Sequence, residues 1–500
     1  MPKATYTKAK YRKLKIQEHQ DNPVISALPD KITPKRLKEL LDNRIQPQSN
    51  IGLDKADRIL EVKRFSKTRI ATKAAWDLYH AVYHLIIQGY ESRNPTNPEV
   101  VEWSYGVADP DMSIEELRES HKSTIYDEAT TTEHLILTGL SGLGKTWIKD
   151  SVFFLTFPTL IKHTRSEFDE IQIVHLHIEM PHDGARGTLL KNIIKSFDEA
   201  LKGVEETNYF KMAQPSLSRP ATIGAMESFV QDLCVRYHVG VIIVDEFQNI
   251  NVSSKGERDK ILQLFDSLSN NLKVPFVKIG TPDSMRFFTQ RLRHGRRAGE
   301  ILEMLPYPKG SRSEVLQDKS ATKGHDWNNF IDALFDFQIV DKPITYSERW
   351  NDELYKLSFG IPYVLFTLWK EAQIDAIRSG AEKLTIRQLN VVYKKRFKLI
   401  RTALNALKKN KFGQFQDLLT VNQLIDKGEH EVALKHLYRF ANEECFSGTA
   451  AIQLLDVVAE MDASFDLSSK QRRLLDQVKS KLEIRAQPVK AGQTIEHDKS

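Results

Sequence analysis

The chain has 500 residues, of which 41% are hydrophobic and 28% charged, so it is long enough for two to four domains with sizeable cores. No run of eighteen apolar residues exists and the N-terminus lacks an apolar signal-peptide core, so we expect a cytoplasmic protein with no membrane partner. The net charge of +6 permits a nucleic-acid partner without requiring one. Cys234 and Cys445 match no metal-ligand spacing and fit a reducing compartment.

Residues 1–110 are predicted to form an N-terminal extension of mixed or helical structure that docks onto a partner. Residues 21–29 have an extended pattern that ends at a proline, and their apolar side chains are typical of a docking segment. Residues 72–88 carry apolar side chains at helical spacing, and Gly89 is expected to end that helix. Basic side chains near the start favour a solvated arm, namely Lys8, Lys10, Arg12, Lys13 and Lys15.

Residues 111–345 are predicted to form a nucleotide-binding core. From about residue 131, apolar and β-branched runs alternate with helical patterns. The runs that predict strands are 134–138, 171–178, 239–246 and 274–281, and those that predict helices are 147–154, 188–201, 223–237 and 260–272. Continuous apolar strands that alternate with helices indicate an α/β fold, with a parallel sheet covered by helices on both faces.

Helical patterns dominate after about residue 345. We expect a helical lid over 346–403 and a helical C-terminal extension over 404–484. The polar tail over 485–500 is expected to be disordered.

The pattern G-x-x-x-x-G-K-T occupies residues 139–146, after a strand-like run and before a helical pattern. Glycines let backbone N–H groups approach a phosphate without a Cβ in the way. Lys145 would reach the β- and γ-phosphates, and the Thr146 hydroxyl would complete a Mg²⁺ shell. We therefore predict ATP and Mg²⁺ as cofactors, with the nucleotide held by Gly139, Ser141, Gly142, Leu143, Gly144, Lys145, Thr146 and Trp147.

The predicted strand over 239–246 ends in two carboxylates. Asp245 is expected to hold Mg²⁺ together with Thr146, and Glu246 to polarise the attacking water, which predicts a Mg²⁺-dependent ATPase. Many buried strands end in acids, so this interpretation depends on the phosphate-loop pattern. Thr281 follows the next strand, where it would lie between Asp245 and the phosphate loop and sense the γ-phosphate; a simple strand-ending turn is the alternative.

A dense basic cluster occupies residues 291–297. One interpretation is an arginine finger, which completes a neighbouring subunit's site by stabilising the transferring phosphoryl group. Arg293, Arg296 and Arg297 are the candidates for that finger. The other interpretation is a solvated or DNA-facing basic surface.

The phosphate loop, the Asp-Glu pair, the polar residue after the fourth strand, the trailing arginines and the helical lid together resemble the AAA+ class. More narrowly, about residues 15–400 resemble TnsC, the ATPase regulators of Tn-seven-like transposons. The segments that carry this resemblance are Asp21-Asn22-Pro23, Ala27-Leu28-Pro29, Gly89-Tyr90, Arg93-Asn94-Pro95, Val244-Asp245-Glu246-Phe247-Gln248, Val274-Pro275, Ile279-Gly280-Thr281-Pro282, Leu292-Arg293, Arg296-Arg297 and Ser358-Phe359-Gly360-Ile361.

The resemblance implies an ATP-dependent regulator of DNA transposition in the bacterial cytosol. Such a protein would assemble with ATP on double-stranded DNA as a ring or helical filament. It would receive a signal from a target-selection protein of the TnsD/TniQ type and recruit transposase subunits of the TnsA/TnsB type. ATP hydrolysis would then serve as a switch.

The resemblance also places DNA contacts at the start of the helix after the second strand and in a nearby loop. These places hold Arg186, Lys191, Lys195 and Thr222. Basic side chains and a helix N-terminus suit phosphates without reading bases. Lys191 and Lys195 are four residues apart, so a solvated helix face is the alternative.

One departure from the AAA+ pattern concerns the lid. Gly360-Ile361-Pro362-Tyr363 has a tyrosine where many AAA+ proteins carry an arginine, which favours a slow switch over a fast, lid-driven motor. Two other functions fit the same residues. One is a nucleotide-gated signalling scaffold that never touches DNA, and the other is a motor similar to a helicase or clamp loader.

Overall fold

The computed structural model describes residues 5–49, 52–98, 100–102, 134–213, 222–282, 300–310 and 324–397. It further describes 401–402, 404, 407, 425, 430–441, 454–455, 458–459, 461–462 and 467–486. The chain divides into two compact units. The first comprises Met1–Arg44, Arg69–Gly139 and Gly144–Leu305, and the second comprises Ile45–Thr68, Leu140–Leu143 and Pro306–Ser500.

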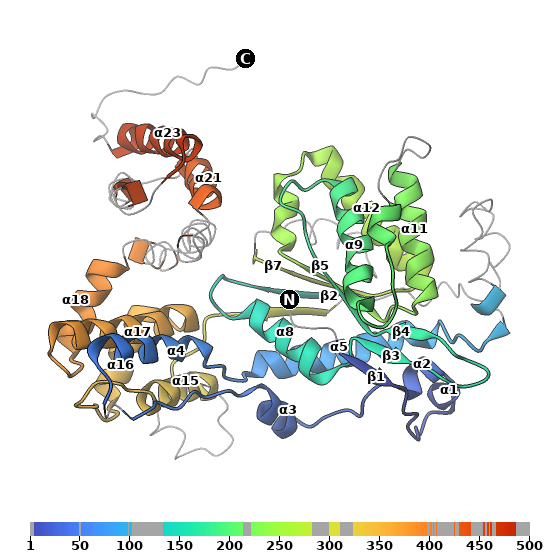
Figure 1. Ribbon diagram of the computed structural model, residues 1–500, viewed down its shortest axis with the longest axis horizontal. Coiled ribbons are helices and arrows are strands. Elements are labelled where there is room, and N and C mark those ends of the chain that lie inside the picture. The colour runs from blue at the N-terminus through green and yellow to red at the C-terminus, as the bar shows by residue number, and fades with distance from the viewer. Residues whose placement is uncertain are drawn as a thin grey trace. The chain divides into compact units, whose positions relative to one another are not determined.

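A five-stranded parallel sheet with the order β5-β6-β7-β2-β8 forms the centre of the first unit (Figure 1). Its strands are β2 (Leu135–Gly139), β5 (His175–Glu179), β6 (Val241–Asp245), β7 (Phe276–Gly280) and β8 (Glu300–Met304). Every residue of the three inner strands is buried, which explains why their sequences are continuously apolar. The edge strand β8 has only one buried residue and was missed in the sequence.

Helices cover both faces of this sheet, as the sequence predicts. The helices α9 (Arg186–Leu201), α11 (Ile223–Arg236) and α12 (Lys255–Leu272) lie over one face (Figure 1). The helices α5 (Lys73–Glu91) and α8 (Lys145–Thr156) pack on the other face (Figure 1). The sheet is therefore the middle layer of three, and its carboxyl edge carries the loops that follow β2, β6 and β7.

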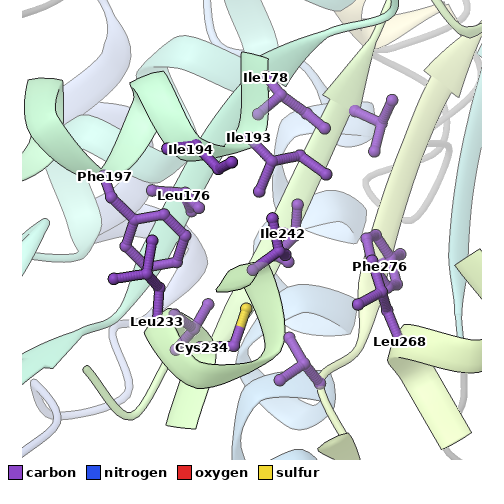
Figure 2. Close-up of a cluster of buried hydrophobic side chains, with 14 of the residues drawn as sticks. Leu176, Ile178, Ile193, Ile194, Phe197, Leu233, Cys234, Ile242, Leu268 and Phe276 are labelled. Carbon is purple, nitrogen blue, oxygen red and sulfur yellow. The ribbon is translucent and has the colours of Figure 1, made fainter. Parts of the chain in front are cut away.

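The main hydrophobic core lies between the sheet and α9, α11 and α12. Figure 2 shows Ile193 and Phe197 of α9 with Leu233 of α11 around the sheet residues Leu176 and Ile242. All five side chains are at most 1% exposed. Since burying one such side chain contributes about 1.5–3 kcal/mol, this core fixes β5 and β6 firmly beneath the helices.

The N-terminal segment packs on the first unit through a second, smaller sheet. Its order is β1-β3-β4, with β1 (Tyr6–Lys8), β3 (Leu160–Lys162) and β4 (Ile171–Ile173). The strand β1 pairs in parallel with β3, which pairs antiparallel with β4. The first residues of the chain thus add a strand to this small sheet.

Residues 21–29 are not extended, because Pro23–Ser26 form the short helix α2. Asn22 caps this helix by accepting a hydrogen bond from the Val24 N–H at 3.2 Å, and Pro23 suits its first position. The Asn22 amide also donates to the Tyr90 carbonyl at 2.9 Å. Capping by the Asn-Pro pair therefore overrides the extended pattern and ties α2 to the end of α5.

The predicted end of a helix at Gly89 is wrong, since α5 continues through it to Glu91. A Cβ at Gly89 would lie 2.8 Å from Cδ of Pro275. The glycine therefore permits close packing of the helix against the segment before β7. It does not terminate the helix.

The single strand predicted over 171–178 is also wrong. The chain divides there into β4 and β5, which belong to different sheets. The Val174 N–H donates instead to the Thr159 carbonyl at 2.9 Å. The run is buried throughout, so its apolar pattern gives no sign of the break.

The second unit is helical where it is described. Its helices are α4 (Lys55–Arg64), α15 (His325–Asp336), α16 (Glu348–Ser358), α17 (Pro362–Ser379), α18 (Ile386–Arg396), α21 (His430–Ala441) and α23 (Ser469–Ala486). The helix α17 packs against α4, α15, α16 and α18, and α21 packs against α23 (Figure 1). The buried Arg58 of α4 pairs with Glu382 at 2.5 Å and Asp341 at 3.2 Å.

The two units cross the predicted domain boundaries. Residues 45–68, within the predicted extension over 1–110, cluster with the lid helices. The helix α15, within the predicted core over 111–345, belongs to the second unit as well. The predicted tail lies outside the described residues from 487 onward. Among the described residues, no helix combines the length and apolar character needed to cross a membrane.

Candidate nucleotide-binding site

The loop after β2 has the backbone that a phosphate-binding loop requires. Gly142 and Gly144 have φ angles of 82° and 97°, a left-handed region that side chains disfavour. The helix α8 begins directly afterwards at Lys145. Its first N–H groups and its dipole therefore meet the loop, which is the arrangement that binds anionic phosphate.

Gly139 is required for a different reason, because it pairs with Met304 of β8. A Cβ at Gly139 would lie 2.6 Å from the Met304 carbonyl oxygen. The glycine thus lets β8 approach the start of the loop. Ser141 and Leu143 lie in the loop, and Thr146 and Trp147 occupy the first turn of α8.

The Lys145 side chain is held by the backbone at the first residue of the loop, Gly139. Its Nζ donates to the Gly139 carbonyl at 2.7 Å. Burial lowers the pKa of Lys145 to about 8, against the opposing effects of the Glu246 and Asp245 carboxylates. A bound phosphate would stabilise the protonated, positively charged form of Lys145.

Asp245 ends β6 with its side chain only 9% exposed. Its Oδ1 accepts the Glu246 N–H at 2.8 Å, and its Oδ2 accepts from Nζ of Lys149 at 2.7 Å. Lys149, one helical turn beyond Lys145, was missed in the sequence. The spacing of four residues on a predicted helix was the signal that both lysines share one face.

Glu246 has the positive φ of 53°, which a non-glycine residue rarely adopts. Its carboxylate accepts a hydrogen bond from the Gln248 amide. Burial and the charge of Asp245 raise the pKa of Glu246, while Lys145 and Gln248 oppose that rise. A carboxylate with a raised pKa is a better proton acceptor than a free one, which suits a general base.

Thr281 directly follows β7, and β7 lies between β2 and β6. Thr281 therefore follows the strand that separates β2, which precedes the phosphate loop, from β6, which ends at Asp245. The residue is buried, with 4% exposure. Its role as a γ-phosphate sensor stays a prediction.

The residues at this edge fit a magnesium nucleotide. The Asp245 carboxylate and the Thr146 hydroxyl are hard oxygen donors, which Mg²⁺ prefers, and Mg²⁺ usually combines one or two such groups with phosphates and water. Among the described residues, no group of three or more His, Cys, Asp or Glu is placed to hold a metal without help from a ligand. Asp245 and Thr146 would therefore share Mg²⁺ with the phosphates. Oδ2 of Asp245 already accepts a hydrogen bond from Nζ of Lys149.

The predicted DNA-contact residues lie on α9 and at the N-terminus of α11, two helices that pack together. Arg186 is the first residue of α9. Burial raises the pKa of Glu227 on α11, and the positive charge of Arg186 partly offsets that rise. Thr222 caps α11 by accepting the Ala225 N–H at 3.2 Å. Lys195 pairs with Glu199 at 3.1 Å on the exposed side of α9.

Lys191 is half-buried on α9, between Arg186 and Lys195 in the sequence. The three basic residues thus share one helix, but each has a different environment. The arginine-finger candidates Arg293, Arg296 and Arg297 lie outside the described residues.

The lid segment that lacks the expected arginine is the start of α17. Within the second unit, the Tyr363 N–H donates to the Gly142 carbonyl at 3.2 Å. Gly360 is in the left-handed region with a φ of 73°, and a Cβ there would lie 2.2 Å from the Tyr307 carbonyl oxygen. Position 363 therefore contacts the phosphate loop through its backbone.

Comparison with known proteins agrees with this geometry. Residues 128–287 match the model of a family described as AAA domain. This segment has the AAA+ P-loop ATPase fold and forms a nucleotide-binding domain.

Two solved structures are similar to the chain. One is a Walker-type ATPase of Pyrococcus abyssi, with 14% identity, a TM-score of 0.33, and coverage of 77% of this chain and 91% of that one. The other is the Aeropyrum pernix ORC2 protein in ADPNP and ADP complexes, with 13% identity, a TM-score of 0.34, and coverage of 76% and 98%. No curated protein matches the chain.

Proposed function

We propose that the chain is a Mg²⁺-dependent ATPase that uses hydrolysis as a switch. The observation that carries this proposal is the carboxyl edge of the sheet, where the phosphate loop follows β2, Asp245 and Glu246 lie at the end of β6, and β7 separates the two strands. Ligands of α/β sheets bind at this edge. When bound, Mg²⁺ would neutralise charge on the phosphates, with Thr146 and Asp245 as its protein ligands.

Different residues bind the phosphates and activate the attacking water. The glycine backbone and Lys145 bind and orient the phosphates, which is most of what phosphoryl transfer requires from a protein. Glu246 takes a proton from the attacking water, because its raised pKa favours proton acceptance. Thr281, next to the loop, orients that water or the γ-phosphate.

The test separates binding from hydrolysis. Glu246→Gln removes the base but keeps the shape, so hydrolysis should fall about a hundredfold or more while nucleotide affinity stays within about threefold of wild type. Lys145→Ala should abolish binding in a fluorescent-nucleotide titration. Unchanged affinity in Lys145→Ala, or loss of affinity in Glu246→Gln, contradicts these roles.

We further propose that ATP controls assembly of the protein on duplex DNA during transposition. The resemblance to TnsC supports this proposal, and so do Arg186 at the N-terminus of α9 and the neighbouring start of α11. Helix N-termini and arginine suit DNA phosphates. The partners would be a target-selection protein of the TnsD/TniQ type and transposase subunits of the TnsA/TnsB type.

Salt dependence tests the DNA contacts. Each phosphate contact adds about −0.9 to the slope of log affinity against log salt concentration, so Arg186→Ala should reduce the steepness by about one. Arg236→Ala makes the same charge change at the far end of α11 and serves as the control. Equal slopes for both variants would remove Arg186 from the DNA surface.

A nucleotide-gated scaffold without DNA binding is the second candidate. Two observations favour it, since Lys195 is paired with Glu199 and Thr222 is engaged as a helix cap. Both side chains then have structural roles that need no DNA. Nucleotide-dependent self-assembly that is unaffected by duplex DNA would establish this function.

A further inference from the structure

The ion pair between Lys149 and Asp245 is the least expected feature of the site. Both side chains are less than 10% exposed, and Nζ lies 2.7 Å from Oδ2 of Asp245 and 3.1 Å from Oδ1 of Asp150. Asp150 is more accessible, with 34% exposure. The ammonium group therefore connects a buried carboxylate to a partly solvated one.

The pairing engages one of the two carboxylate oxygens through which Asp245 could hold a metal. Oδ1 of Asp245 already accepts the Glu246 N–H, which leaves Oδ2 as the oxygen that Lys149 occupies. A buried carboxylate is costly without a counter-charge, and Lys149 supplies that charge from inside the protein. The usual source of such a charge in a nucleotide site is the divalent ion.

The surrounding charges show why one added cation matters. Glu246 is next to Asp245, and Glu179 at the end of β5 adds to the negative potential felt at Glu246. The charge of Lys145 and the hydrogen bond from Gln248 oppose that effect. The imidazole of His177, beside Lys149, is kept neutral by burial. Without Lys149, the triphosphate would meet a buried negative charge at Asp245.

We propose that Lys149 is a built-in counter-cation of Asp245 that lowers the dependence of nucleotide binding on Mg²⁺. It would keep the site receptive to free nucleotide. Mg²⁺ would have to compete with Lys149 for Oδ2, with Asp150 retaining the displaced ammonium group. Lys149 is a positioning residue here, and this inference rests on the proposed nucleotide binding.

The test compares nucleotide affinity with and without the metal. A fluorescent ATP analogue is titrated into wild type, Lys149→Met and Lys149→Arg, in EDTA and at increasing Mg²⁺ concentrations. In Lys149→Met, Asp245 has no partner at Oδ2, so affinity in EDTA should fall about tenfold and half-maximal enhancement should need about tenfold less Mg²⁺. Lys149→Arg retains the charge, so its ratio of nucleotide affinities in Mg²⁺ and in EDTA should be close to that of wild type.

The controls address folding. Lys278→Met removes another buried lysine from the same sheet, on β7, and should leave the ratio of affinities in Mg²⁺ and EDTA unchanged. If Lys149→Met is too unstable to titrate, Asp245→Asn with Lys149→Met removes both charges. In EDTA that double variant should bind nucleotide about as well as wild type does, because the uncompensated charge of Asp245 is absent.

The outcomes distinguish this inference from the proposed function. A Mg²⁺ enhancement that is the same in wild type and Lys149→Met overturns the counter-cation role and leaves ATP binding intact. Absence of nucleotide binding in wild type under both conditions overturns the proposed function itself.

Discussion

Lys145 is the residue whose protonation controls the site. Burial lowers its pKa to about 8, and phosphate binding requires the charged form. Nucleotide affinity should therefore be nearly constant below pH 7. It should fall about tenfold by pH 9, because only about a tenth of the lysine is still charged one unit above its pKa.

A binding titration over pH 6.5–9.5 measures this dependence. Lys145→Arg is the matched variant, since arginine keeps its charge throughout that range, and its weaker binding should vary little with pH. A wild-type affinity that stays constant up to pH 9.5 would show that the lysine is not titrating in this window.

Residue-level chemistry was predictable only where a motif encodes it. The glycines and Lys145 follow from a spacing that the backbone geometry requires, and their conformations agree with it. Lys149 belongs to no motif. Its importance comes from the approach of α8 to the end of β6, across 96 residues of sequence.

At the scale of elements, the segments Gly89-Tyr90 and Arg93-Asn94-Pro95 serve to join α5 to the sheet. The Arg93 guanidinium donates to the Val239 carbonyl at 2.8 Å and lies over the Tyr90 ring. The Tyr90 hydroxyl donates to the His238 carbonyl at 2.8 Å. Tyr90 thus links α5 to the segment before β6.

Tyr90→Phe removes that hydrogen bond and leaves a carbonyl without its partner. The free energy of unfolding should fall by about 1–3 kcal/mol in chemical denaturation. Tyr6→Phe changes a 45% exposed side chain in the same way and should have almost no effect. Equal stability of the two variants would mean that the Tyr90 hydroxyl contributes nothing to docking.

Buried histidines make the first unit sensitive to acid. Burial lowers the pKa of His163 to about 4 and that of His175 to about 3, and His175 bonds to His177 at 2.9 Å. The unfolded state binds protons below about pH 6.5, whereas the folded state does so only near the lowered values. The free energy of unfolding should therefore fall as the pH falls from about 6.5 toward 4.

The slope of this loss is the measurable quantity. Each buried histidine contributes about 1.4 kcal/mol per pH unit within its window. His175→Gln should reduce the slope by about that amount in denaturation series between pH 6 and 5. His80→Gln, which replaces an exposed imidazole on α5, is the matched control for the loss of a histidine.

Sequence patterns predicted the inner strands and the long helices well, because their burial is regular. They failed where the partner is distant in sequence. The strands β1 and β3 have three residues each, and they pair although they lie at residues 6 and 160 of the sequence. The strand β8 is mostly exposed and therefore lacks an apolar pattern. The division between β4 and β5 is likewise set by pairing in two sheets, which no local pattern encodes.

At the scale of the molecule, the chain interleaves its two compact units. Residues 45–68 leave the N-terminal segment to join the helical unit, where Arg58 is buried against Glu382 and donates to the Ile339 carbonyl at 2.9 Å. Sequence patterns could not show this exchange, because Arg58 reads as an exposed charge on a polar helix. Because each unit is built from three separate segments, the chain passes between the two units several times.

We propose above that ATP drives assembly of this protein on duplex DNA. Sedimentation of the purified chain with a duplex fragment tests it directly, with a non-hydrolysable ATP analogue, with ADP and without nucleotide. We expect large DNA-bound assemblies with the analogue alone and none for Lys145→Ala. Nucleotide binding without any DNA-dependent assembly would contradict it and favour the scaffold.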